Sequence, residues 1–129
     1  MKLGTREWVD KAEADLATAA RELRARKQPN YDAACFHAQQ CVEKYLKTRL
    51  VEANIRFTKT HNLERLLDLI LPREPLWDSF RPMLIDMSSY AVAYRYPGES
   101  ATRELAKQAV ADCKVIRQAI RSSLGLAKS

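Results

Sequence analysis

One stretch in the first half of the chain decides its fold: Phe36-His37-Ala38-Gln39-Gln40-Cys41-Val42-Glu43-Lys44-Tyr45-Leu46-Lys47. At about 100° per residue, its apolar side chains and those just before it fall on one broad arc of a helix, and the polar ones fall on the opposite arc. The apolar arc holds Ala34, Cys35, Ala38, Val42, Tyr45 and Leu46, and the polar arc holds His37, Gln40, Glu43, Lys44 and Lys47. The pattern predicts a helix that packs through one face. The other face has the groups to hold a phosphate, a nucleotide or a facing subunit, and it is equally compatible with a solvated surface.

The helix that contains this stretch has recognisable limits. Asn30 can cap its start after the break at Gln28-Pro29, and the helical pattern then runs from Tyr31 to about Asn54. Before the break, apolar residues recur every three or four positions over about residues 5–26 and predict another amphipathic helix. The length predicted for the second helix is typical of the central element of a bundle.

The second half of the chain predicts helices separated by proline-containing turns. Residues 54–60 lose the helical period and predict a loop, after which Thr60 or Asn62 can cap the next helix. Helices are expected over residues 63–70, 83–94 and 102–123, with a single turn at residues 76–80, and Gly125 is placed to end the last one. The predicted fold class is therefore all-α, an antiparallel up-and-down helical bundle of four long helices plus one or two short ones.

The size of the chain fits one domain with one hydrophobic core, spanning residues 1–129. Its candidate core consists of Trp8, Leu16, Leu23, Ala38, Val42, Tyr45, Leu46, Leu66, Leu67, Leu84, Ile85, Leu105 and Ile116. Only three residues are glycine, and no Asn-Gly or Asp-Gly pair marks a hairpin turn. Strands are therefore not expected.

The composition limits the partners and the location of the protein. There are 22 lysine and arginine residues against 16 aspartate and glutamate residues, a net charge of +6. This surplus suits an anionic partner such as RNA or an acidic protein, and equally a basic surface without a specific ligand. The apolar runs are too short to cross a membrane, and the start lacks the apolar stretch of a secretory signal. We expect a cytoplasmic protein without membrane contact.

The cysteine and histidine residues give no sign of a metal centre. Cys35, Cys41 and Cys113 form no CxxC pair and are odd in number, which favours free thiols in a reducing compartment. His37 and His61 do not stand at metal-ligand spacing to a second ligand. The chain also lacks a Walker sequence, a glycine-rich phosphate loop and the paired carboxylates of a metal site. No metal and no cofactor are expected, nor nucleotide transfer by this chain alone.

Four blocks of sequence closely resemble the HEPN domain family in their order and spacing. They are Trp8-x-x-x-Ala12-x-x-Asp15-Leu16, residues 40–47, residues 57–63 followed by Leu66-Leu67, and Tyr94-Arg95-Tyr96-Pro97. The resemblance covers nearly the whole chain. It implies an α-helical bundle that forms a homodimer and is often encoded beside a separate minimal nucleotidyltransferase. Members of the family have been proposed to bind nucleotides, and several resemble the toxin halves of toxin–antitoxin pairs or RNase modules.

The resemblance also implies where catalytic residues would lie. HEPN ribonucleases have an Arg, then four to six intervening residues, then a His near the start of a late helix; the His acts as acid or base and the Arg stabilises the charged phosphorane. Arg95 stands where this Arg is expected, but residues 100–102 are Ser-Ala-Thr, so the late motif is absent. Arg56 and His61 have the spacing of this motif, but they lie in an earlier loop. The match either reflects a catalytic site or is a coincidence. The candidate catalytic residues are therefore His61 and Arg95, with Arg56 as the alternative partner of His61. The simpler interpretation is that His61 has a structural role at a helix start.

The candidate ligand-binding residues come from the polar arc and from the later blocks: His37, Gln40, Lys44, Lys47, Lys59, Arg95 and Tyr96. Arg95 can donate two parallel hydrogen bonds to a phosphate, and Tyr96 can stack on a ligand or contact it through its hydroxyl. The same residues also fit a turn closed by Pro97, solvated lysines or an ion-paired dimer seam. The sequence thus predicts a nucleotide- or RNA-binding module. The alternatives are a metal-independent RNase toxin and a purely structural dimerising adaptor.

Overall fold

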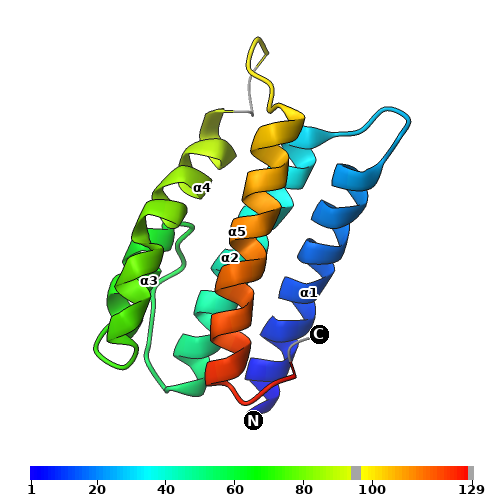
Figure 1. The fold of residues 1–129 in the computed structure, drawn as a ribbon. Coiled ribbons are helices and arrows are strands. Elements are labelled where there is room, and N and C mark those ends of the chain that lie inside the picture. Colours follow the sequence, from blue (N-terminus) through cyan, green and yellow to red (C-terminus); the bar gives the residue numbers. More distant parts are fainter. Residues whose placement is uncertain (94–96, 128–129) are drawn as a thin grey trace.

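The computed structural model describes the backbone of residues 1–93 and 97–127, and the side chains of residues 1–90 and 97–127 (Figure 1). Its elements are α1 (Leu3–Arg24), α2 (Tyr31–Glu52), α3 (Leu63–Ile70), the short 3-10 helix η1 (Pro75–Phe80), α4 (Arg81–Ala93) and α5 (Arg103–Ser123). This described part of the chain contains no strand, and the all-α fold class is confirmed. With 13 residues, α4 is the shortest of the four main helices, since α1, α2 and α5 have 21 or 22.

The main helices alternate in direction along the chain. In Figure 1, α1 runs upward, α2 downward, α4 upward and α5 downward, and the short α3 descends next to α4. The central element is α2, because it contacts α1, α3, α4 and α5. The residues between α2 and α3 form an extended segment that runs back along α2, which we call the 53–62 loop (Figure 1).

Two of the five residues on the polar arc of α2, Glu43 and Lys47, are buried, and the other three are half-buried. The side chains of Glu43 and Lys47 are only 3% and 6% exposed, and Gln39 and Thr48 are buried as well. The prediction that only one face of this helix packs is therefore wrong. Aromatic side chains from α1 and from the 53–62 loop cover the second face, and the opposite charges of Glu43 and Lys47 compensate one another where water is excluded.

Local caps fix the ends of the helices, as the sequence predicted. The side chains of Asn30 and Asn62 each accept a hydrogen bond from the backbone N–H three residues further on, at 2.9 and 3.1 Å. At the end of α5, Gly125 adopts a φ of 73°, and Leu126 N donates to Arg121 O at 2.8 Å. The cap at Asn62 also sets the direction of the chain at the end of the 53–62 loop.

A charged network joins α1, α2 and α5. Glu13 on α1 accepts hydrogen bonds of 2.7 Å from both Nε and Nη2 of Arg117 and one of 2.5 Å from the Tyr45 hydroxyl. Arg121 also donates to the Tyr45 hydroxyl, at 3.1 Å. The hydrogen bonds from Arg117 hold the pKa of Glu13 below its ordinary 4.5, whereas burial raises the pKa of Tyr45.

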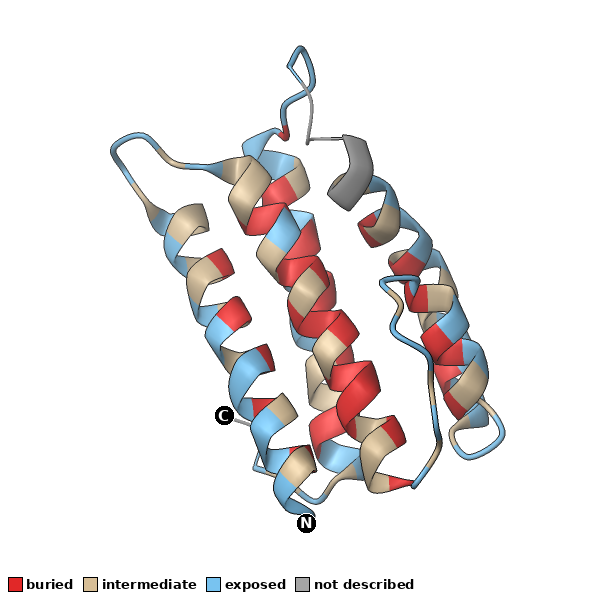
Figure 2. Cartoon of the chain, turned by 180° about the vertical axis from the view of Figure 1, so that it is seen from behind, coloured by how far each residue is buried: buried red, intermediate tan, exposed pale blue. Residues whose placement is uncertain are grey.

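Buried residues line the sides on which the helices face one another (Figure 2). Eight of the predicted core residues are buried, namely Ala38, Val42, Tyr45, Leu46, Leu66, Leu67, Leu84 and Ile116, and Trp8, Leu16, Leu23 and Leu105 are half-buried. Ile85 is 48% exposed, so its assignment to the core is wrong. The reason is that α4 lies at the edge of the fold, where Leu84 takes the inward position and the next residue points about 100° away from it.

Candidate functional site

The 53–62 loop carries His61 to the side of α2. The start of the loop is anchored by a hydrogen bond of 2.9 Å from Ile55 N to Leu50 O in the last turn of α2. The middle of the loop is anchored by half-buried Phe57, which packs against the core. At its end, Thr60 Oγ1 accepts a hydrogen bond of 3.1 Å from Asn62 N, which closes a tight turn around His61. These contacts determine which part of α2 the imidazole meets.

The exposed ring of His61 is held by a buried carboxylate. Its Nδ1 lies 3.0 Å from Oε1 and 3.2 Å from Oε2 of Glu43. Because an ionised carboxylate can only accept, Nδ1 donates this hydrogen bond. Nε2 has no hydrogen-bond partner among the described residues and is the atom left for a ligand or for proton transfer. An imidazole oriented by a carboxylate is the arrangement found in general acid–base sites.

Lys47 holds the same carboxylate from another direction. Its Nζ lies 3.1 Å from Oε2 of Glu43, and 5.5 and 5.9 Å from the ring centroids of Trp8 and Phe57. The two rings attract the ammonium through their π faces and keep water from the ion pair. The ammonium of Lys47 is thus committed to the protein, and its effect is to fix the direction in which Glu43 faces His61.

A second histidine, on α2 itself, is held in a similar manner. Nδ1 of His37 lies 2.8 Å from Oδ1 of Asp15 on α1, and Nζ of Lys44 contacts Oδ2 of the same carboxylate. The ring of His37 also meets the ring of Phe36 edge-on, with the centroids 5.3 Å apart. Lys44, like Lys47, is therefore paired with a carboxylate that lies mostly out of the solvent.

The other predicted ligand-binding residues differ in how available they are. Gln40 is half-buried and donates to the side chain of Gln39 at 2.8 Å. Lys59 is exposed in the 53–62 loop, as is Arg56, and neither forms an ion pair with any residue in the described part of the chain. Arg95 and Tyr96 lie outside the described residues. Among the described residues, the loop therefore presents two cations without an ion-pair partner together with the oriented imidazole.

The structure groups four of the predicted site residues around two carboxylates that the predicted site did not include. One cluster is His61, Glu43 and Lys47, and the other is His37, Asp15 and Lys44. Glu43 stands four residues before Lys47, a spacing that favours an ion pair on a helix and could have drawn attention to it. Asp15 belongs to the first of the four sequence blocks. No local signal connects either carboxylate to a histidine.

Other reactive groups of the described part were also located. It contains no group of three or more His, Cys, Asp and Glu side chains that could hold a metal ion. None of its helices has the length and apolar character needed to cross a membrane. Cys35, Cys41 and Cys113 are buried free thiols, and burial raises the pKa of Cys35 to about 11. A thiol with such a pKa is not a nucleophile at neutral pH.

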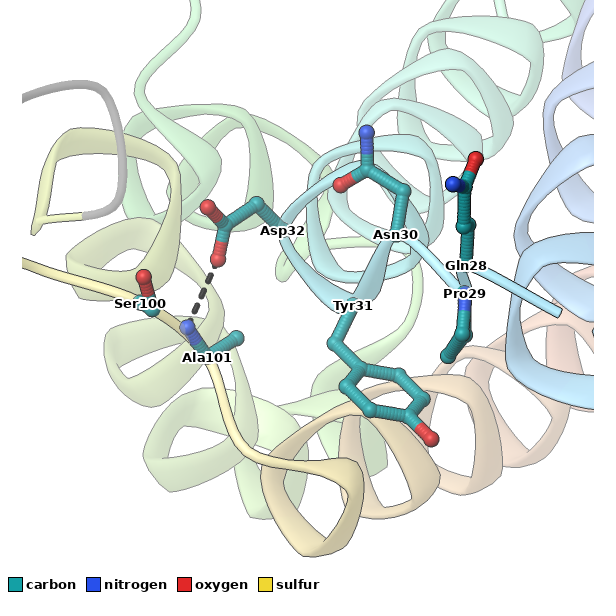
Figure 3. A pocket seen from close by; sticks show the side chains of 7 residues that line it. All are labelled: Gln28, Pro29, Asn30, Tyr31, Asp32, Ser100 and Ala101. Atoms are coloured by element: carbon teal, nitrogen blue, oxygen red, sulfur yellow. Dashed lines mark hydrogen bonds between the residues drawn. The ribbon is translucent and has the colours of Figure 1, made fainter.

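A polar pocket of about 300 Å³ lies where α2 and α5 begin (Figure 3). Its lining residues are Gln28, Pro29, Asn30, Tyr31, Asp32, Ser100 and Ala101. Asp32 accepts a hydrogen bond of 2.6 Å from Ala101 N, which joins the first turn of α2 to the segment before α5. Asp32 is the only charged residue among those lining the pocket, so the pocket disfavours a phosphate.

The comparison with protein families gives a single result. The model of the HEPN domain matches residues 5–123, a range that includes both histidine clusters and the 53–62 loop. No curated protein and no solved structure matches the chain. The resemblance seen in the four sequence blocks is therefore confirmed over nearly the whole length, and this chain belongs to the HEPN domain family.

Proposed function

We propose that this HEPN domain binds the phosphate groups of a nucleotide or of RNA at the 53–62 loop. Support comes from the contact between Glu43 and His61, which holds an exposed imidazole in one orientation with Nε2 unpaired. In the same loop are the exposed side chains of Arg56 and Lys59, which form no ion pair within the described part of the chain. An anion that binds there meets an imidazole that the fold has already oriented, which reduces the entropic cost of binding. The net charge of +6 favours the approach of such a ligand.

The three loop side chains have different roles in this proposal. The planar guanidinium of Arg56 suits two parallel hydrogen bonds to phosphate oxygens, whereas Lys59 adds a point charge. His61 donates through Nε2 when it is protonated and accepts through Nε2 when it is neutral. Arg95 and Tyr96 are proposed as further ligand contacts. The polar-arc residues His37, Gln40 and Lys44 are proposed as the adjoining wall, and the buried Lys47 as the cation that holds Glu43 behind it.

Salt dependence and matched variants test the phosphate site. Binding of a labelled single-stranded RNA, followed by fluorescence anisotropy, should weaken steeply with salt because each phosphate contact releases counterions. Lys59→Ala should lower the affinity and reduce the slope of log K against log salt by about 0.7. Lys114→Ala removes an equal charge from an exposed position on α5 and is the control. Equal effects of the two variants would contradict a specific site, and no binding at low salt would leave the structural adaptor as the explanation.

We further propose that the 129 residues act as one domain that forms a homodimer with a cytoplasmic role, and that this dimer works with a separately encoded minimal nucleotidyltransferase, as in a toxin–antitoxin pair. Support comes from membership of the HEPN family. Light scattering of the purified chain tests the dimer. Co-purification of a co-expressed minimal nucleotidyltransferase with the tagged chain tests the partner. A monomer, or a nucleotidyltransferase that elutes separately, would contradict the respective part.

A second function, metal-independent RNA cleavage, is favoured by the same contact. An imidazole held by Glu43 can take the proton of a 2′-hydroxyl, and Arg56 or Arg95 would then stabilise the charged phosphorane. The test is incubation of RNA with the protein in excess chelator, using His61→Ala and, as a control, Lys114→Ala at an exposed position on α5. Cleavage lost only in His61→Ala supports this function. Cleavage that persists in His61→Ala excludes this imidazole from the reaction.

A further inference from the structure

A small cavity opens on α1 at Trp8, whose ring contacts Lys47 of the His61 cluster. It has a volume of about 240 Å³ and is lined by Gly4, Glu7, Trp8 and Lys11. These positions are spaced three and four residues apart and share one face of the helix. The half-buried indole of Trp8 lines the cavity, and Glu7 and Lys11 are exposed at the rim.

Trp8 and His61 contact the same buried ion pair. Nζ of Lys47 lies 5.5 Å from the Trp8 ring centroid and 3.1 Å from Oε2 of Glu43, whose Oε1 lies 3.0 Å from Nδ1 of His61. A continuous chain of contacts therefore leads from the cavity wall to the imidazole. The ammonium also holds the indole in one orientation, so the ring that lines the cavity is set before any ligand arrives.

We propose that the cavity at Trp8 is a subsite for the base of a nucleotide whose phosphate binds at the 53–62 loop. This subsite presupposes the phosphate site proposed above and extends it to recognition of a whole nucleotide. A flat aromatic wall suits a base, because stacking on an aromatic side chain is favourable for every base. At the rim, Lys11 supplies a donor and Glu7 an acceptor for the edge of the base. A sugar phosphate has no planar group that could occupy the cavity.

Two probes that differ only in the base separate this subsite from the phosphate site. AMP and ribose 5-phosphate carry the same phosphate, and only AMP carries a base. Trp77→Phe provides the background, since Trp77 is buried against Phe80 and its replacement leaves Trp8 as the only tryptophan of the chain. Trp8 fluorescence then reports on the cavity, and the ring resonances of His61 in NMR spectra report on the phosphate.

Both probes should shift the His61 resonances, and only AMP should quench Trp8. AMP should bind about 5- to 150-fold more tightly than ribose 5-phosphate, the range expected for one stacked base. Equal affinities with unchanged Trp8 fluorescence would overturn the base subsite and leave the phosphate site standing. If neither probe shifts the His61 resonances at any usable concentration, the phosphate site fails, and the base subsite fails with it.

Variants in the cavity complete the test. Trp8→Phe should keep the preference for AMP because it keeps an aromatic wall, whereas Trp8→Leu should abolish the preference, with the affinities for AMP and ribose 5-phosphate compared within the same variant. Circular dichroism checks that both variants are folded. Because Trp8 also contacts Lys47, a misfolded Trp8→Leu is replaced by Lys11→Ala at the exposed rim, which should lower AMP affinity a few-fold. A Trp8→Leu variant that alters only the oligomeric state, with its preference for AMP intact, would overturn the subsite in favour of a protein contact.

Discussion

Nδ1 of His61 lies 3.0 Å from Oε1 of Glu43, although the imidazole is 78% exposed and the carboxylate only 3% exposed. The contact joins a surface group to the interior, because Glu43 is itself paired with Lys47 between two aromatic rings. The stability of the interior and the orientation of the surface imidazole therefore depend on one carboxylate. Substitutions at the three residues should separate these two effects.

Glu43→Gln should destabilise the fold strongly. The substitution leaves the ammonium of Lys47 buried without a counter-charge, and breaking a buried pair in this way typically costs about 3–5 kcal/mol. Urea unfolding measures the loss. The double variant Glu43→Gln with Lys47→Met should recover much of it, since methionine can fill the space between Trp8 and Phe57 without a charge. Losses that simply add in the double variant would show that the two side chains are not coupled.

His61→Ala should have the opposite profile, with little effect on stability and a large effect on binding. An exposed side chain outside the core changes the free energy of unfolding by less than about 0.5 kcal/mol. Loss of one hydrogen bond to a charged phosphate should weaken RNA binding by about 1.5–3 kcal/mol, or roughly ten- to a hundred-fold. His37→Ala, measured in parallel by anisotropy, should retain more affinity. A His61→Ala protein that binds like the wild type would show that the imidazole does not contact the ligand.

Acid should weaken the contact between α1 and α5. The hydrogen bonds of Arg117 lower the pKa of Glu13 below its ordinary 4.5, so the folded protein holds this proton less tightly than the unfolded chain does. The resulting stabilisation is present above pH 4.5 and is lost as the pH falls through the lower folded pKa. Thermal unfolding from pH 6 down to pH 3 should therefore show a smaller loss of stability for Glu13→Gln than for the wild type. Parallel curves for the two proteins would contradict this.

The helices and their ends could be predicted because their signals are local. Asn30, Asn62 and Gly125 act on backbone groups within a few residues, and each ends or begins a helix where the sequence predicted it. The resemblance carried by four short blocks was equally accessible, since their spacing can be counted along the chain. The exposure of Ile85 could not be predicted from the sequence. Whether a side chain at the edge of the apolar face is covered depends on which helices lie beside α4.

The candidate site could be predicted only in part. His61 was identified from its sequence context, but its partner Glu43 lies 18 residues away and meets it through the path of the 53–62 loop, which no local pattern encodes. The pairing of Lys44 with Asp15 depends in the same way on how α1 packs against α2. Helical angles placed both lysines on one polar arc, but only the packing of α1 and the loop determines which of their charges are already compensated.

Asn62→Ala should test whether the turn around His61 matters for binding as well as for stability. The Asn62 side chain caps α3, and its backbone N–H donates to Thr60 Oγ1, so the residue holds the end of the loop from both sides. Loss of the cap should cost about 1 kcal/mol, as should Thr102→Ala, which removes the cap of α5. The two variants thus lose similar stability in urea unfolding, but only Asn62→Ala also loosens the imidazole.

RNA affinity should therefore fall in Asn62→Ala and stay near the wild-type value in Thr102→Ala. A general loss of stability would affect binding in both variants equally, whereas a displaced His61 affects binding only in Asn62→Ala. Equal affinities would mean that Glu43 alone is sufficient to orient the imidazole.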